Sequence, residues 1–152
     1  MPPERPKIIG VSCSIFRRAL ESLRERGDLD FPIHYLDSML HMHPNELRKH
    51  MEKQVDSFSS TYDALLLIYG ECHNNMENYE EEPKIIRTNG RNCIEIFLGQ
   101  DKYKKLEKTK VFFLLPEWTM RWREVFTKEL GLNDEIAHDF MKDMHSSLLY
   151  LD

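Results

Sequence analysis

The sequence predicts a single α/β domain over residues 1–152, with residues 1–6 expected to be flexible. Short apolar segments rich in β-branched residues alternate with longer segments in which apolar residues recur every three or four positions. This alternation is typical of strands joined by crossover helices, and it predicts a three-layer sandwich around a mostly parallel sheet of five or six strands. A chain of 152 residues that is 41% hydrophobic is long enough for one such core. The predicted architecture is Rossmann-like or flavodoxin-like.

The first half of the chain predicts three strands and two helices. Residues 7–13 (KIIGVSC) form a compact β-branched run that leads into an amphipathic helix, which ends near Gly27. Residues 31–36 (FPIHYL) predict the second strand. Apolar residues then recur at helical spacing over residues 44–58, and the proline that opens this segment suits a first helical turn. Residues 64–69 (ALLLIY) are apolar at nearly every position, which indicates a central strand covered on both faces.

The second half of the chain predicts three further strands and three helices. Residues 71–83 are polar and rich in helix-breaking residues, which predicts a mobile surface loop. The later strands are predicted at residues 84–88, 111–115 and 147–151, and the helices at residues 93–106, 120–130 and 135–144. The residues expected in the core of the sheet are Ile8, Ile9, Val11, Leu65, Leu66, Leu67, Ile68, Phe112, Phe113 and Leu114.

The composition argues against several classes of protein. Lys and Arg number 21 against 26 for Asp and Glu, so the formal net charge is -5 and the isoelectric point is near 5.8. Because an acidic chain is poorly suited to phosphate-dominated binding, we expect no nucleic-acid partner. No apolar run approaches the length of a membrane span, and the N-terminus lacks the apolar segment and cleavage site of a signal peptide. We therefore expect a cytoplasmic protein without a membrane partner.

Three cysteines are predicted to lie at one edge of the sheet. Cys13 ends the first strand, Cys72 follows the third strand, and Cys93 comes a short loop after the fourth. In a flavodoxin-like strand order, the first and third strands flank the ligand crevice, which brings Cys13 and Cys72 together there. Cys13 and Cys93 also precede predicted helices, where the helix dipole favours a thiolate over a thiol. This environment suits the ligation of a soft metal.

The chemistry of three thiolates leaves several alternatives open. Three thiolates from separate loops can hold a zinc ion or three irons of a cubane iron–sulfur cluster, with a fourth position left for a side chain, water or substrate. The spacing of the cysteines is not diagnostic, since no C-x-x-C motif occurs. One alternative is a metal-free thiol that acts in redox or nucleophilic chemistry. Another is three small residues buried at strand ends without a chemical role.

A histidine would complete the coordination shell. His41, His43 and His73 lie in loops predicted at the same edge of the sheet. His41 is the favoured metal ligand, because the segment LHMHP follows the second strand and places its ring within reach of the first. His43 has an alternative position beside the start of the following helix.

Two further kinds of side chain are candidates for the same edge. Glu71 precedes Cys72 and is a candidate catalytic acid or base, provided that it is shielded from water. Trp118 and Trp122 follow the fifth strand and are candidates for a wall of the crevice that binds a cofactor or small molecule. A spacing of four residues serves equally well for packing a helix on the sheet. Phosphate-binding glycine loops and G-x-S-x-G nucleophile motifs are absent from the sequence.

Several segments together resemble a known family. IIGVSC, LDSMLHMHP, LLLIYGEC, NGRNCIEIFLG, PEWTMRW and LLYLD are similar to segments of an uncharacterised family of archaea and bacteria, number 1638 in the domain-of-unknown-function series. The likeness extends from about Lys7 to Asp152. The residues that match the family's motifs are Cys13, Cys72, Cys93, His41, Trp118 and Trp122. Members occur in methanogens and other anaerobes, and the resemblance implies an association with corrinoid-dependent methyltransferase genes.

The leading hypothesis joins the cysteine pattern to this resemblance. It is a cytoplasmic protein with an iron–sulfur cluster, or alternatively zinc, that acts as an enzyme or accessory factor in anaerobic one-carbon metabolism. The resemblance implies a corrinoid methyltransferase or its activation protein as partner, and an open coordination position would accept a small-molecule ligand. Two alternatives stand beside it. One is a non-enzymatic partner module with a structural metal, and the other is a metal-free enzyme with Cys13 as the nucleophile.

Overall fold

Strands and helices alternate along the computed structural model, which describes residues 4–81 and 84–152. The predicted α/β class is therefore confirmed. The chain divides into two compact units, residues 1–92 (unit 1) and residues 93–152 (unit 2). The flexibility expected for residues 1–6 falls in part on residues 1–3, which lie outside the described residues.

Unit 1 is built on a four-stranded parallel sheet in the order β2-β1-β3-β4. Its strands are β1 (Ile8–Cys13), β2 (Ile33–Leu36), β3 (Ala64–Ile68) and β4 (Ile85–Arg87). This order is the flavodoxin-like one, in which β1 and β3 are neighbours at the point where the strand order reverses. The predicted central strand is confirmed, since β3 pairs with β1 on one side and with β4 on the other.

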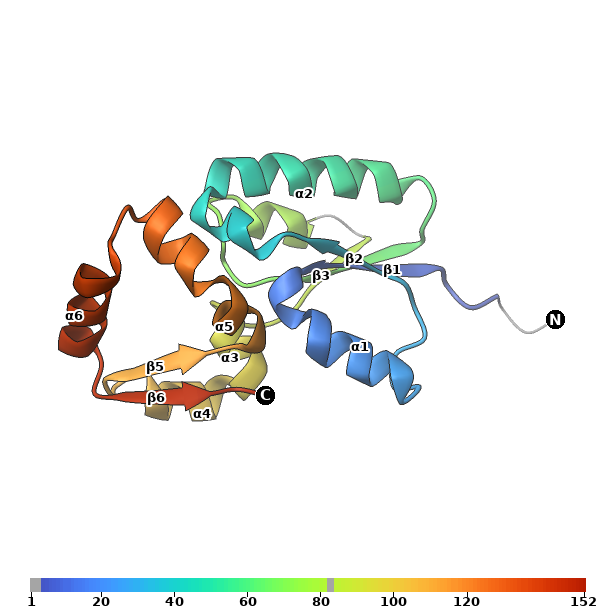
Figure 1. Cartoon of the computed structure of the whole chain (residues 1–152). Coiled ribbons are helices and arrows are strands. Elements are labelled where there is room, and N and C mark those ends of the chain that lie inside the picture. The colour runs from blue at the N-terminus through green and yellow to red at the C-terminus, as the bar shows by residue number, and fades with distance from the viewer. Residues whose placement is uncertain (1–3, 82–83) are drawn as a thin grey trace. The chain divides into compact units, whose positions relative to one another are not determined.

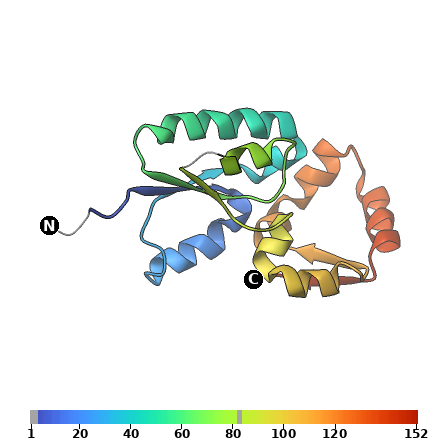
Figure 2. The same cartoon turned by 180° about the vertical axis from the view of Figure 1, so that it is seen from behind.

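Helices cover both faces of this sheet, as the three-layer prediction requires. Figures 1 and 2 show helix α1 (Arg17–Glu25) on one face and helix α2 (Pro44–Ser59) on the other. Helix α2 ends one residue beyond its predicted range. Helix α1 begins at Arg17, because the first residues after β1 form a 3-10 turn, η1 (Ser14–Phe16). A second 3-10 helix, η2 (Ser38–Met42), follows β2.

The main core of unit 1 lies between the sheet and α2. Alternate residues of β1 and β3 point to this side, so Val11, Leu65 and Leu67 are fully buried. From α2, Leu47 and Met51 pack onto them with 2% and 0% of their surface exposed. Burial of a side chain of this size contributes about 1.5–3 kcal/mol, so these contacts supply much of the stability of unit 1.

The segment after β3 differs from its prediction. The sequence predicted a polar surface loop over residues 71–83, but residues Met76–Glu81 form a 3-10 helix, η3, whose Met76 and Tyr79 are only 1% and 8% exposed. Both side chains belong to the core under α2. The surface-loop prediction was wrong because two apolar residues three positions apart are inconspicuous among the Asn and Glu residues around them. Residues 82–83 lie outside the described residues.

Unit 2 contains a two-stranded parallel sheet and a set of helices. Its strands are β5 (Val111–Leu114) and β6 (Ser147–Tyr150). Its helices are α3 (Cys93–Leu98), α4 (Gln100–Leu106), α5 (Pro116–Arg123), a π-helical segment η4 (Glu124–Glu129) and α6 (Asp134–Met144). The helix predicted over residues 93–106 is split into α3 and α4 at Gly99, whose positive φ of 77° ends the first helix.

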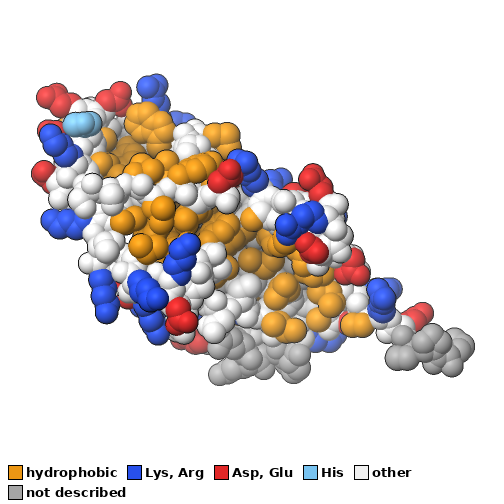
Figure 3. Space-filling view, turned by 90° about the horizontal axis from the view of Figure 1, so that it is seen from below, with side chains coloured by type: hydrophobic (Ala, Val, Ile, Leu, Met, Phe, Trp, Pro, Cys, Tyr) orange, Lys and Arg blue, Asp and Glu red, His pale blue; other side chains and the backbone are white. Residues whose placement is uncertain are grey.

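The described strands therefore form two sheets, where the sequence predicted one. In unit 2 the core prediction was wrong, because Phe112, Phe113 and Leu114 are only half-buried. A two-stranded sheet cannot bury both of its faces. Hydrophobic side chains also reach the surface on the face drawn in Figure 3. The large exposed ones of unit 2 are Met120, Trp122, Leu130, Ile136, Phe140, Met144, Leu148 and Tyr150. Among the described residues, every helix is too short or too polar to cross a lipid bilayer.

Candidate metal-binding site

Cys13 lies at the carboxyl end of β1, next to the end of β3. Ser12 is the register partner of Ile68, so the residues that follow them, Cys13 and Tyr69, are level with each other across the two strands. Side chains alternate between the faces of a sheet, which places Cys13 on the same face as Val11, under α2. The half-buried Cys13 packs against the core cluster on that face, and Tyr69 is a member of the cluster.

Cys72 reaches the same cluster from the loop after β3. Its side chain is half-buried and packs against the cluster that Cys13 also contacts. Burial raises the pKa of the Cys72 thiol, and the Gly70 backbone and Arg87 oppose this only in part. The thiol is therefore protonated at neutral pH, and a metal ion that binds it must displace the proton. Cys13 and Cys72 therefore both pack against the core cluster under α2, and their convergence at one site stays a prediction.

The hydroxyl group of Tyr69 lies buried among these contacts. Tyr69 is 2% exposed, and its hydroxyl oxygen has no hydrogen-bond partner among the described residues. Burial raises the pKa of Tyr69, and the charges of Cys13 and Cys72 raise it further. Tyr69 could not be found from the sequence, because its ring completes an apolar strand pattern in which the hydroxyl group is inconspicuous.

The segment before Cys93 is held against the end of β3. A methyl group on Gly70 would lie 2.6 Å from the Cα of Asn92 and 2.7 Å from the carbonyl oxygen of Arg91. The backbone N–H of Glu71 donates a hydrogen bond of 2.8 Å to the same carbonyl oxygen of Arg91. The backbones approach this closely because glycine has no side chain. Cys93 is the next residue in the chain.

The Thr88 side chain, just after β4, forms hydrogen bonds with the backbone at the end of β3. Its hydroxyl oxygen accepts a hydrogen bond of 3.2 Å from the backbone N–H of Tyr69. The same hydroxyl group lies 3.2 Å from the Tyr69 carbonyl oxygen and 3.4 Å from that of Leu67, so its proton has two acceptors at hand. A side chain thus replaces the sheet hydrogen bonds where the strands stop. The backbone that carries Tyr69 and Gly70 is thereby fixed.

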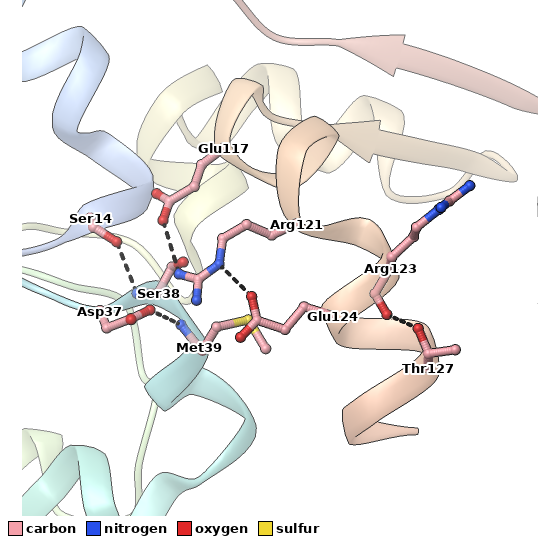
Figure 4. Close-up of polar contacts among 9 residues, drawn as sticks. All are labelled: Ser14, Asp37, Ser38, Met39, Glu117, Arg121, Arg123, Glu124 and Thr127. Atoms are coloured by element: carbon pink, nitrogen blue, oxygen red, sulfur yellow. Dashed lines mark hydrogen bonds and ion pairs between the residues drawn. The ribbon is translucent and has the colours of Figure 1, made fainter. Parts of the chain in front are cut away.

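The three candidate histidines have different surroundings. His41 lies exposed on η2, whose first turn is fixed by the Asp37 carboxylate, which accepts a hydrogen bond from the Met39 N–H at 2.8 Å (Figure 4). His43 is also exposed and precedes α2. His73 is 8% exposed, and its Nδ1 accepts a hydrogen bond of 3.3 Å from the Asn75 N–H. Its Nε2 is buried and has no partner in the described part of the chain.

Glu71 does not meet the condition set for a catalytic group. The sequence allowed it a role as acid or base only if it were shielded from water, and its side chain is exposed. Its backbone holds Arg91 in place, whereas its carboxylate faces solvent. No chemical role for the Glu71 side chain follows from these surroundings.

Unit 2 carries the remaining candidates. Cys93 is the half-buried first residue of α3, as the sequence predicted. Trp118 and Trp122 lie one turn apart on α5, and the Arg123 guanidinium lies 5.0 Å from the centre of the Trp122 ring. Beside them on the helix, Arg121 pairs with Glu117 at 3.5 Å and with Glu124 at 3.1 Å (Figure 4). A role of the two indoles as a crevice wall stays a prediction.

Within residues 4–81 and 84–152, no three His, Cys, Asp or Glu side chains form a group that could hold a metal ion. Cys13 and Cys72 both pack against the core cluster, but among the described residues they do not belong to a group of three His, Cys, Asp or Glu side chains.

One comparison with known proteins gives a match. Residues 35–152 match the model of a family described as protein of unknown function, DUF1638. The matched range contains Cys72, Cys93, His41 and both tryptophans, and it begins after Cys13. Neither the curated proteins nor the solved structures include a match.

Proposed function

We propose that this chain, which belongs to the DUF1638 family of proteins of unknown function, binds an iron–sulfur cluster, or alternatively a zinc ion, through Cys13, Cys72 and Cys93. The observation that supports the proposal is the packing of both Cys13 and Cys72 against the core cluster that also contains Tyr69, whose buried hydroxyl group has no partner among the described residues. Two soft ligands from neighbouring loops at the carboxyl edge of a parallel sheet are half of a sulfur-rich site.

Cys93 supplies the third thiolate in this proposal. It follows Asn92, whose backbone lies against Gly70, two residues before Cys72. The peptide bond to Asn92 limits how far Cys93 can be from that point, since consecutive Cα atoms are about 3.8 Å apart. This covalent limit keeps the Cα atom of Cys93 close to Asn92, and for that reason the proposal assigns the third thiolate to Cys93.

The protonated state of Cys72 argues against Cys72 itself as a reactive thiol, whereas the metal-free alternative has Cys13 as its nucleophile. A reactive cysteine needs a lowered pKa, which positive charge around a partly exposed thiol provides. Burial instead raises the pKa of Cys72. A metal ion deprotonates a bound thiol by its own charge, so a buried thiol remains a competent ligand.

The fourth coordination position is proposed for His41 or for a small-molecule ligand. His41 is exposed on η2, so its ring is not held by packing and is available to a metal. If water occupies the position instead, the metal can act as a Lewis acid on a bound oxygen or sulfur. The identity of the fourth ligand decides the role of the metal. A metal with four protein ligands is structural, whereas a metal with an open fourth position can react.

The proposed setting is anaerobic one-carbon metabolism in the cytoplasm, with a corrinoid methyltransferase or its activation protein as partner. This part of the proposal rests on the family resemblance described for the sequence. A reducing cytoplasm keeps thiols available for metal. Titration calorimetry of the metal-loaded protein against a purified corrinoid protein tests the partnership, and heat that vanishes on removal of the metal is the expected result. Absence of binding in both forms contradicts it.

The metal site is tested by anaerobic purification of the full chain and of the variants Cys13→Ser, Cys72→Ser and Cys93→Ser. We expect the parent protein to hold one metal ion or one cluster, and each variant to lose it, because three loops each contribute one ligand. Visible charge-transfer absorption identifies a cluster, whereas zinc is colourless. His138→Ala, on the exposed surface of α6, is the control and retains the metal. Full retention by all three cysteine variants contradicts the proposal.

A further inference from the structure

A groove in unit 1 lies between α2 and the segments that follow β3. Its volume is about 700 Å³, within the range of about 300–1,000 Å³ that is usual for small-molecule sites. One wall is a single face of α2, because the residues that α2 contributes are spaced three or four positions apart, from Glu52 to Ser59. The opposite wall comes from η3 and from the start of β4.

Tyr79 lines this groove and carries a polar group without a partner. Only 8% of its surface is exposed, and its ring packs edge-on against the ring of His73, with the ring centres 5.9 Å apart. Among the described residues, its hydroxyl group makes no hydrogen bond. Native proteins seldom leave so buried a hydroxyl group unsatisfied. Because packing fixes the ring, the acceptor for its proton must lie in the groove.

Two carboxylates face the same hydroxyl group. Glu52 and Asp56 lie one turn apart on α2 and both line the groove. Burial, together with the charges of these two residues, raises the pKa of Tyr79 to about 12, so its hydroxyl group is a donor at neutral pH. Glu52 pairs with Arg48 at 3.1 Å. Asp56 has no ion pair among the described residues, so its charge is available to a cation in the groove.

Lys84 brings a positive charge to the groove from the other wall. Its Nζ lies 3.5 Å from the carbonyl oxygen of Ser59 at the end of α2. Asp56 comes three residues before Ser59, which is about 5 Å along the helix axis. The negative and positive ends of the groove are therefore about one helical turn apart. Val55 and Ile85 line it with apolar side chains.

We propose that this groove binds a free α-amino acid with an apolar side chain. The ammonium group of the amino acid pairs with Asp56 and Glu52, and its carboxylate accepts hydrogen bonds from the Tyr79 hydroxyl group and the Lys84 ammonium group. An amine alone would leave the phenol without an acceptor, and a carboxylate alone would be repelled by the two acidic side chains. The groove contains none of the proposed metal ligands, so this site is independent of the proposed function.

The experiment follows the backbone amide NMR signals of the isotope-labelled full chain during titration with L-leucine, L-methionine and L-phenylalanine. We expect saturable shifts of amides in α2 and η3 with at least one of them. Two fragments of leucine serve as matched ligands, since isoamylamine lacks the carboxylate and isocaproate lacks the ammonium group. Each fragment should bind at least about 10-fold more weakly than L-leucine, because it leaves a charged or buried polar group unpaired.

Two substitutions locate the binding site. Asp56→Asn and Tyr79→Phe should each lower the affinity for the amino acid by about 10- to 100-fold, because each removes a hydrogen bond that involves a charged group. Both variants should fold, since Asp56 is exposed and phenylalanine keeps the ring of residue 79. Glu46→Gln is the matched control, because this carboxylate lies in the first turn of α2 and outside the groove, and it should retain the parent affinity.

The results divide as follows between support and contradiction. Weaker binding of both leucine fragments, with loss of affinity in Asp56→Asn and Tyr79→Phe but not in Glu46→Gln, supports the site. Isoamylamine that binds as tightly as L-leucine overturns it, because the carboxylate then contributes nothing. Absence of saturable shifts with all three amino acids overturns it, and so does unchanged affinity in both groove variants. None of these results depends on a bound metal, so failure of this site does not bear on the cysteines.

Discussion

Gly70 is the residue that lets the last segment of unit 1 approach β3. Its missing side chain leaves room for the backbone of Arg91 and Asn92, which a methyl group would meet at 2.6 to 2.8 Å. Contacts this short with backbone cannot be relieved by a change of rotamer. Any larger residue at this position must push the segment that leads to Cys93 away from the end of β3.

Gly70→Ala should therefore destabilise the protein by about 1–3 kcal/mol, the usual cost of overpacking. Urea unfolding followed by circular dichroism measures the change. Gly10→Ala is the matched control, because the nearest atoms there belong to side chains at 3.2 Å or more and can move aside. An alanine at position 70 that costs no more than one at position 10 contradicts the close approach.

Tyr79 makes stability depend on pH in the alkaline range. Burial raises the pKa of Tyr79 to about 12 from its ordinary value of 10.0, with Glu52 adding to the shift. The folded state then holds the proton more tightly than the unfolded state, so this contribution is complete below pH 10 and is lost as the pH rises through 12. Tyr79→Phe lacks the contribution.

We expect the free energy of unfolding of the parent chain to fall more steeply than that of Tyr79→Phe between pH 10 and pH 12. Denaturant titrations at a series of pH values measure both curves. Tyr150→Phe serves as the control, because Tyr150 is 44% exposed, and its curve should follow the parent. Parallel curves for the parent and Tyr79→Phe would exclude this effect of burial.

At the scale of single residues, the sequence predicted the cysteines better than their surroundings. Cys13 and Cys72 could be placed at one edge, because strand ends are visible in apolar patterns and parallel strands end on the same side. The Tyr69 hydroxyl group and the role of Gly70 could not be found, since both depend on which backbone lies next to β3. Glu71 was placed near Cys72 correctly, but its exposure depends on packing that the sequence does not express.

Helix α6 begins where the local sequence provides an N-terminal cap. The side chain of Asn133 accepts a hydrogen bond of 2.8 Å from the Ile136 N–H and so satisfies one of the unpaired donors at the start of the helix. Asp134 and Glu135 follow in the first turn, where negative charge favours the helix dipole. Residues 134–144 match the predicted range closely for this reason.

Asn133→Ala should destabilise α6 by about 1 kcal/mol, because it removes the cap. Hydrogen exchange of the α6 amides detects the change even if global unfolding hardly moves. Asn133→Asp is the matched control, since its carboxylate keeps the acceptor and should keep the parent exchange rates. Equal exchange in Asn133→Ala and the parent would show that the cap contributes nothing.

The elements that were mispredicted depend on tertiary packing or on one backbone angle. Residues 71–83 looked like a polar loop, and Met76 and Tyr79 turned it into a buried helical turn. The helix expected over residues 93–106 is interrupted at Gly99, where the apolar periodicity hardly changes. Periodicity finds an element, but it does not report the φ angle that ends one.

The two units differ in how many hydrophobic side chains they bury. The main core cluster, from Ile9 to Ile85, lies within unit 1 and joins the four-stranded sheet to α2. In unit 2 the buried hydrophobic residues are Leu115 and Ala137, as far as the described residues go. A two-stranded sheet with so little behind it is marginal alone.

Residues 1–92 expressed alone should fold and unfold cooperatively, whereas residues 93–152 alone should not. Circular dichroism and denaturant unfolding of the two fragments measure this directly. A fragment of residues 1–92 without a cooperative transition would support the single domain that the sequence predicted. The α/β class and the strand order of unit 1 could be predicted, but the division into two sheets could not, because pairing depends on tertiary contacts that apolar patterns do not record.

The proposed function requires that three cysteine sulfurs bind one metal centre. X-ray absorption spectroscopy at the metal edge of the anaerobically purified full chain tests it most directly, because it counts the ligand atoms and measures their distances. We expect sulfur neighbours at about 2.3 Å, with at least the three thiolates among them. A spectrum that contains only nitrogen and oxygen neighbours around the bound metal would contradict it.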